Sequence, residues 1–214
     1  SAFINDRLAV IEKELGNVDE SISSYKSSQL LPDVQAASGL YMSQSSQNDA
    51  QLLSLNTQLS IAQYVAGFVN SHTDNKQLLP ANAGVNNQAV ENQINSYNTL
   101  LLQRNSLVAN SSESNPVAAD MDNQLSLMRA AISQSLSNYI VSLKTQIASF
   151  ERSQRETTKK IAANPEQAMH LLSVERQQKV KESLYLFLLQ KREENELSQA
   201  YSSNKTRVIM QPFG

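Results

Sequence analysis

The chain contains no cysteine and no tryptophan, and only five glycines and five prolines among its 214 residues. Without cysteine it cannot form disulfides, use thiol catalysis or hold a metal through sulfur. Five phenylalanines and seven tyrosines are too few for a thick globular core. A thin contact between two helices, here called a seam, needs only one stripe of apolar residues on each helix. Because glycine and proline interrupt helices, their scarcity favours long helices. These absences predict an all-α protein built from elongated helices.

The chain also lacks a large excess of positive or negative charge, and it contains no long apolar run. Eighteen basic and twenty acidic side chains leave a net charge of −2, which gives no electrostatic basis for binding nucleic acid. The longest apolar run covers only residues 184–189, well short of the roughly 18 residues that a membrane span requires. No signal peptide is visible, and Ser1 follows no initiator methionine. We therefore expect the chain to be part of a longer protein.

Serine, asparagine and glutamine make up about a third of the chain, and its apolar residues recur at helical spacing. Proline interrupts this spacing, because it lacks an amide donor and clashes with the preceding turn. The predicted seams are Leu8 to Tyr25, Leu52 to Val69, Val90 to Val108 and Met121 to Phe150, and the prolines that punctuate them are Pro32, Pro80, Pro116 and Pro165. The fourth seam is the most regular and predicts one helix from Val117 to about Lys160.

We expect turns near residues 75–86, 111–116 and 161–165, with Asn164 capping a final helix whose first residue is Pro165. Residues 36–50 are polar and contain a glycine, which predicts either a solvated helix or a local break. The β-branched segment 206–210 predicts a short strand. The architecture that follows is an antiparallel helical hairpin or thin, coiled-coil-like bundle over residues 1–205, with 206–214 as an end segment. Stripes this narrow favour self-association into a homo-oligomer.

No pattern in the chain predicts catalysis, a cofactor or a metal site. Phosphate-binding loops, G-x-S-x-G and H-E-x-x-H are absent, and the two histidines, His72 and His170, lie far apart. We expect the carboxylate clusters to be solvated helix faces, because general acid–base work needs a desolvated, concave site. These clusters are Glu12/Glu14, Asp120/Asp122 and Glu193/Glu194/Glu196. The prediction is that this chain is not an enzyme.

The final helical segment, Val174 to Ala200, contains a dense apolar knot, Leu-Tyr-Leu-Phe-Leu-Leu at 184–189, between charged flanks. Six consecutive apolar residues face all sides of a helix, whereas a buried stripe needs about three in seven. The knot is therefore either a crowded core, where the helix meets several neighbours, or a contact between subunits.

Three stretches carry a resemblance to a known family. The first is the pattern of Arg176, Val180, Leu184, Tyr185, Leu188, Leu189, Lys191, Glu193 and Glu194. The second is Asn115-Pro116-Val117 followed by Met121-Asp122 and Gln124-Leu125, and the third is Ile94, Tyr97-Asn98, Leu101 and Arg104-Asn105. In order and spacing, residues 78–210 resemble the periplasmic helices of bacterial tyrosine autokinases and chain-length determinants, which are polysaccharide co-polymerases. The first 75 residues agree only in being helical.

The resemblance implies a periplasmic domain held between two inner-membrane helices, with long helices extending from a small α/β base. Segment 206–210 would then be a strand returning to that base. Such proteins assemble in rings and set the length or export of capsular or exopolysaccharide, so the implied partners are further copies, a polysaccharide polymerase or an outer-membrane export protein. The family's membrane spans and cytoplasmic kinase lie outside these residues. The alternative is the helical hairpin of another periplasmic export adaptor, although adaptors have a single hairpin and this chain has several helix breaks.

Overall fold

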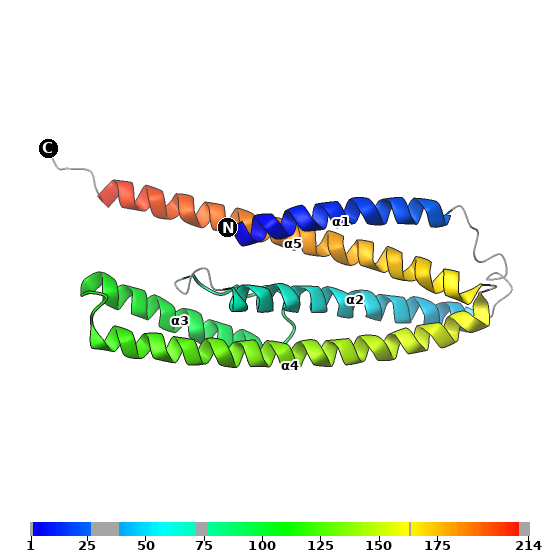
Figure 1. Cartoon of the computed structure of the whole chain (residues 1–214), viewed down its shortest axis with the longest axis horizontal. Helices are drawn as coiled ribbons and strands as arrows, with labels where there is room; N and C mark the ends of the chain where they lie inside the picture. Colours follow the sequence, from blue (N-terminus) through cyan, green and yellow to red (C-terminus); the bar gives the residue numbers. More distant parts are fainter. Residues whose placement is uncertain (1, 27–38, 72–76, 163, 210–214) are drawn as a thin grey trace. The chain divides into compact units, whose positions relative to one another are not determined.

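The structure is a computed structural model that describes residues 2–26, 39–71, 77–162 and 164–209. Every regular element in these ranges is an α-helix, which confirms the all-α prediction (Figure 1). The helices are α1 (Ala2–Lys26), α2 (Gly39–Asn70), α3 (Gln88–Asn110), α4 (Pro116–Ile161) and α5 (Pro165–Ile209). That the chain as a whole is elongated stays a prediction.

The predicted strand at 206–210 is wrong for residues 206–209, because α5 continues to Ile209. A strand needs a neighbour to satisfy its backbone groups, whereas a helix satisfies them internally, and the described residues include no other strand. Residue 210 lies outside the described ranges. The polar segment predicted at 36–50 is helical from Gly39 onwards. Helix α1 continues through Gly16 without a break. The three predicted turns separate the helices as expected.

The chain divides into two compact units, each of which has its own packing. Unit 1 comprises Ser1–Asp49 and Arg155–Gly214, so it is assembled from both ends of the sequence. Unit 2 is the continuous segment Ala50–Gln154. The boundaries between the units fall inside α2 and α4 rather than in loops.

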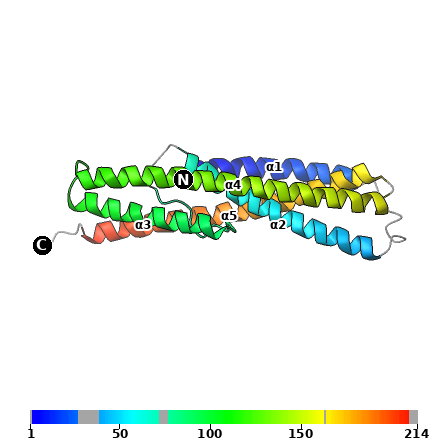
Figure 2. The ribbon, with the colours of Figure 1, turned by 90° about the horizontal axis from the view of Figure 1, so that it is seen from below.

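In unit 1, α1 lies antiparallel along α5 (Figures 1 and 2). The buried residues of α1 are Ile4, Leu8 and Ile11, and those of α5 include Ala168, Val180, Leu184 and Leu188. Two polar contacts fix the register beside this seam. Tyr185 donates a 2.7 Å hydrogen bond to Glu12, and Lys181 lies 3.3 Å from Glu14. The sequence pattern at Leu8 and Ile11 therefore finds its partner in the last helix.

In unit 2, both α2 and α3 pack against α4 (Figures 1 and 2). The large apolar residues buried on α4 are Leu125, Ile132, Leu136, Leu143 and Ile147, all members of the predicted seam. Towards the C-terminal end of this stripe, Leu143 and Ile147 join Leu52, Leu55 and Ala62 of α2 in one apolar cluster. Towards its N-terminal end, α4 lies beside α3, whose buried residues Val90, Ile94, Tyr97 and Leu101 also match the prediction.

The loop from 77 to 87 joins α2 to α3 and is fastened at several points. Asn82 and Gly84 have positive φ angles of 54° and 87°. At Gly84 a side chain would be strained by this backbone angle and would also lie 3.4 Å from the Ile61 methyl group. The Asn82 amide donates to Glu91, and Asn87 caps α3 by accepting a 3.1 Å bond from the Val90 amide. The loop therefore has a defined shape and is held to the start of α3.

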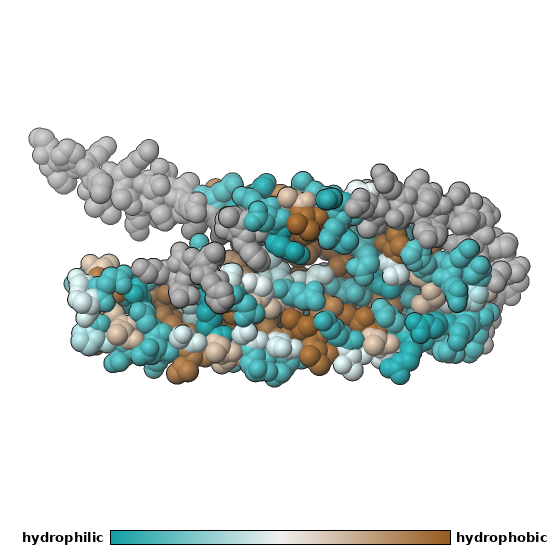
Figure 3. Space-filling view, in the orientation of Figure 1, coloured by the Kyte–Doolittle hydropathy of each residue, from teal (hydrophilic) through white to brown (hydrophobic). Residues whose placement is uncertain are grey.

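Exposed apolar side chains are dispersed among polar ones. Along α4, at the lower edge of Figure 3, brown residues alternate with teal and white ones. The large exposed apolar residues are Val10, Leu78, Leu102, Val117, Leu127, Val141, Leu186 and Leu197. Within the described ranges, no helix is both long enough and apolar enough to cross a membrane.

Candidate binding site

The hairpin between α3 and α4 is closed by Arg104, whose side chain lies almost wholly inside unit 2 and is 7% exposed. Its Nε donates to Asp122 Oδ1 at 2.8 Å, and its Nη2 donates to Asp122 Oδ2 at 3.3 Å and to Glu113 Oε2 at 3.1 Å. The hydrogen bond to Asp122 raises the pKa of Arg104 further above its ordinary value, although burial opposes this. The forked, charge-assisted geometry therefore ties the two helices together beside their turn.

The prediction that Asp120 and Asp122 lie on a solvated helix face is confirmed by their exposure, but Asp122 is also the partner of a buried arginine. Asp120 is exposed, but both carboxylate oxygens of Asp122 accept hydrogen bonds from Arg104. The two residues are 18 positions apart, so no local rule of helix spacing pairs them. Only the hairpin brings Arg104 from α3 next to Asp122 in the second turn of α4.

A second arginine, Arg129 on α4, binds the C-terminal end of α2. Its Nε donates to the Val69 carbonyl at 2.7 Å, and its Nη2 lies 3.4 Å from the carbonyl oxygens of Phe68 and Ser71. The last turn of α2 contains no basic residue of its own. Because the last carbonyls of a helix lack partners and carry partial negative charge, a guanidinium is well suited to them. Arg129 therefore caps a helix that precedes it by some 60 residues.

The same guanidinium also contacts Tyr97 of α3. Its Nη1 donates to the Tyr97 hydroxyl at 3.1 Å, and its central carbon lies 5.9 Å from the centre of the tyrosine ring. The Tyr97 side chain is 1% exposed, in agreement with the prediction that it packs in the core. Next to it, Asn98 pairs with the backbone of Leu79 through two bonds, of 2.8 Å to the amide and 2.9 Å to the carbonyl. Adjacent residues of α3 thus hold α4 and the 77–87 loop.

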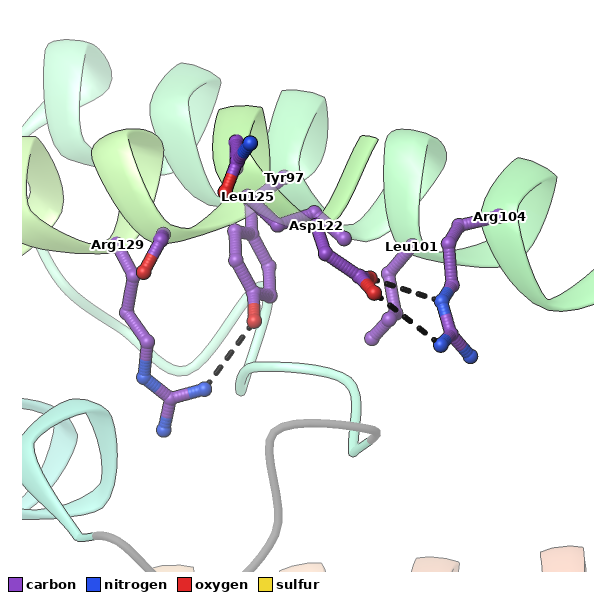
Figure 4. Close-up of a pocket in the computed structure, with 8 residues that line it drawn as sticks. Tyr97, Leu101, Arg104, Asp122, Leu125 and Arg129 are labelled. Atoms are coloured by element: carbon purple, nitrogen blue, oxygen red, sulfur yellow. Dashed lines mark hydrogen bonds and ion pairs between the residues drawn. The ribbon is translucent and has the colours of Figure 1, made fainter. Parts of the chain in front are cut away.

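A cavity of about 390 Å³ lies between these two arginines in unit 2. Figure 4 shows the Tyr97 hydroxyl and Arg129 guanidinium at one end and the Asp122–Arg104 ion pair at the other. The lining residues are Tyr97, Leu101, Arg104, Asp122, Asn123, Leu125, Ser126 and Arg129. Its volume is near the lower end of the range of about 300–1,000 Å³ found for small-molecule sites. Most of the lining comes from one face of α4.

Asn115 and Pro116, two further residues of the resemblance, start α4 rather than line the cavity. Asn115 accepts a 2.9 Å bond from the Val117 amide, and its carbonyl accepts the first helical bond from Ala119. Pro116 occupies the first helical position, where a missing amide donor costs nothing. Asn164 and Pro165 repeat the arrangement at α5, as predicted.

The remaining predicted residues belong to α5 in unit 1. Arg176 is buried and lies 3.5 Å from Asp49, and Tyr185 contacts α1 through Glu12. Lys191 lies 3.1 Å from Glu194 and 5.7 Å from the centre of the Phe187 ring, whereas Glu193 is exposed. Val180, Leu184 and Leu188 are buried. The resemblance therefore marks two sets of residues, one in each unit, and not one site.

The apolar knot at 184–189 is buried on one face of α5 only. Leu188 is fully buried and Leu184 is 8% exposed, whereas Leu186 between them is 64% exposed. Tyr185, Phe187 and Leu189 are half-buried, and the interpretation of the knot as a core that meets several neighbours stays a prediction. The interpretation as a subunit contact stays a prediction, and Leu186 is the residue that it concerns.

No group of three histidine, aspartate or glutamate side chains in the described part of the chain could hold a metal ion. His170 is exposed on α5, and His72 lies outside the described ranges. Both guanidinium groups at the cavity contact protein acceptors. The arrangement is that of a fastened helical hairpin with a polar cavity.

Arg129 is the residue that sequence reasoning missed. It lies four positions after Leu125 and three before Ile132, beside the predicted apolar seam, where the sequence does not indicate which acceptors a lone arginine finds. The one available signal was the lack of a basic residue in the last turn of α2, which leaves its terminal carbonyls without a local partner. That signal indicates that a cap is needed but not which later residue supplies it.

Tyr64 gives a prediction for alkaline pH. Burial on α2 raises its pKa from 10.0 to about 12. Because the unfolded chain releases this proton near pH 10, the stabilising effect is complete below pH 10 and is lost as the pH rises towards 12. We expect a loss of about 2 kcal/mol across this range. Chemical denaturation at successive pH values measures it, and Tyr64→Phe should lose less stability. An identical decline in both proteins would contradict the assignment.

Comparison of the chain with family models, curated proteins and solved structures finds no match in any of the three. The resemblance therefore depends on the residues quoted above. What the structure adds is the set of contacts that Tyr97, Asn98, Arg104, Asp122 and Tyr185 make.

Proposed function

We propose that this chain is a non-catalytic scaffold from the periplasmic side of a polysaccharide co-polymerase or tyrosine autokinase. In this proposal it regulates the chain length, polymerisation or export of a capsular or exopolysaccharide at the inner membrane. Its partners would be further copies of itself and a polymerase or outer-membrane export protein.

One observation supports this proposal above the others. Arg104 belongs to one stretch of the resemblance and Asp122 to the next, and the two side chains form a forked ion pair with a 2.8 Å contact. Tyr97 and Asn98, from the same stretch as Arg104, likewise bind Arg129 and the 77–87 loop. Residues that resemble the family in order and spacing thus cooperate in one structural task. In a scaffold, residues are expected to hold helices and loops together in this way, because none of them has to touch a substrate.

The lengths of the helices are consistent with a scaffold. The 46 residues of α4 correspond to about 69 Å at about 1.5 Å per residue. A long helix fastened at several points along its length presents polar and apolar side chains at fixed spacing. Such a surface can hold a partner in position without any chemical step.

A genetic experiment tests the function directly. In the bacterium that encodes the chain, deletion of the complete gene should change the length distribution or the amount of a surface polysaccharide, as measured by gel electrophoresis of extracted polymer. The natural gene should restore the original distribution, and a gene carrying Leu188→Asp should fail to do so. If the deletion leaves both the length and the amount of every surface polysaccharide unchanged, the proposal is wrong.

A further inference from the structure

In the cavity of unit 2, some hydrogen-bond donors have no acceptor among the described residues. Arg129 has five N–H groups, and four of them have partners in Val69, Phe68, Ser71 and Tyr97. One Nη1 hydrogen remains. The Tyr97 hydroxyl accepts from Arg129, but its own hydrogen has no acceptor among the described residues. Two donors therefore remain at the same end of the cavity, one on the half-buried Arg129 and one on the buried Tyr97.

The two ends of the cavity differ in charge. Arg104 is matched by the carboxylates of Asp122 and Glu113, whereas no described carboxylate pairs with Arg129. The α2 carbonyls offset its charge only in part, because a helix terminus carries about half an elementary charge. The Arg129 end therefore attracts an anion. At the other end Asp122, with a half-exposed side chain, retains lone pairs that attract hydroxyl donors.

The spacing along α4 defines the length of a suitable ligand. Asp122, Ser126 and Arg129 follow one another at four and three residues, so they lie on one helix face. Over seven residues this face is about 10 Å long, at about 1.5 Å per residue. The exposed side chains of Asn123 and Ser126 lie between the charged ends, and neither bonds to another described residue. They add a hydroxyl and an amide that can both donate and accept.

We propose that this cavity binds a small hydroxy acid, with its carboxylate on Arg129 and Tyr97 and its hydroxyl groups towards Ser126 and Asp122. A simple carboxylate would leave the acceptors of Asp122 facing an apolar chain. A neutral polyol would leave the charge of Arg129 unmatched. Inorganic phosphate would fill little of the 390 Å³ and would meet the negative charge of Asp122. This inference is independent of the proposed function, because it uses only the geometry of unit 2.

Three probes of similar length test the inference on the whole chain. D-gluconate has the carboxylate and the hydroxyls, D-glucitol has only the hydroxyls, and hexanoate has only the carboxylate. Nuclear magnetic resonance titration of the ¹⁵N-labelled protein should show saturable shifts with gluconate at millimolar concentrations or below, greatest around Asn123, Ser126 and Arg129. Glucitol and hexanoate should bind at least about tenfold more weakly, since each lacks one of the charged or polar contacts.

A pair of matched variants locates the site. Ser126→Leu removes a hydroxyl and fills part of the cavity, and it should weaken gluconate binding at least about tenfold. Ser137→Leu makes the same change at another exposed position of α4 and should leave binding unchanged. Circular dichroism checks that both variants keep their helices. Absence of saturation with gluconate, equal affinity for all three probes, or equal binding by both variants would each overturn the proposal.

Discussion

Leu188→Asp should separate α1 from α5. Leu188 is fully buried in unit 1, on the stripe that faces Leu8 and Ile11. The change removes about 2 kcal/mol of apolar burial and places a carboxylate without a partner in an apolar seam. We expect a total loss of about 5 kcal/mol, which is comparable with the whole stability of a small folded unit. Leu184→Asp at the neighbouring buried position should act in the same direction.

Hydrogen exchange with mass spectrometry measures this separation locally. Amides of α1 should lose protection in Leu188→Asp, whereas those of α3 in unit 2 should keep it. Leu186→Asp is the matched control, since it makes the same chemical change two residues away at a position that is 64% exposed. It should preserve the protection of α1. Retention of α1 protection in Leu188→Asp, or equal loss in both variants, would show that this stripe does not hold the two helices together.

The second large effect concerns the ion pair of Arg104 and Asp122, and it is asymmetric. Asp122→Ala leaves an arginine side chain that is 7% exposed with only Glu113 and Asn105 as partners. Arg104→Met leaves a carboxylate that is half exposed and can return to water. We therefore expect a cost of about 3 kcal/mol for Asp122→Ala and about 1 kcal/mol for Arg104→Met.

A double-mutant cycle by urea denaturation isolates the interaction. The double variant should be about as stable as Arg104→Met alone, which gives a coupling energy of about 3 kcal/mol. Glu113→Ala is the control, because Glu113 is 63% exposed and should contribute less than about 1 kcal/mol. If the effects of Arg104→Met and Asp122→Ala simply add, the pair contributes no specific stabilisation and the fork is incidental.

Much of the fold follows from patterns within single segments. The spacing of Leu125, Ile132, Leu136, Leu143 and Ile147 predicts both the helix and its buried face, and the structure confirms both. The asparagine–proline pairs at 115–116 and 164–165 mark helix starts because their local chemistry is sufficient to cap a helix. The predicted strand at 206–209 is wrong because local chemistry is not sufficient to form a strand. A β-branched segment forms a strand only beside another strand, and none lies in the described part of the chain.

The polar contacts were harder to predict, because they depend on which helices meet. Arg129 binds α2, and Asp122 binds Arg104, across 60 and 18 positions of sequence. No rule of helix spacing, which pairs residues three or four positions apart, predicts either contact. The resemblance did single out Tyr97, Asn98 and Arg104, but as members of a pattern with no stated task. Their partners, and the cavity that they surround, appear only when α3 and α4 are placed side by side.

The division of the chain has a consequence for its synthesis. Unit 2 is continuous, so all of its helices can meet soon after the ribosome has passed residue 154. Unit 1 is not continuous, because Glu12 can bind Tyr185 only after another 173 residues have been synthesised. At about 5–20 residues per second this interval is about 9–35 s. During that time the apolar stripe of α1 is without α5. The first helix to be made is thus among the last to be buried, and a chaperone that shields α1 would act within this interval.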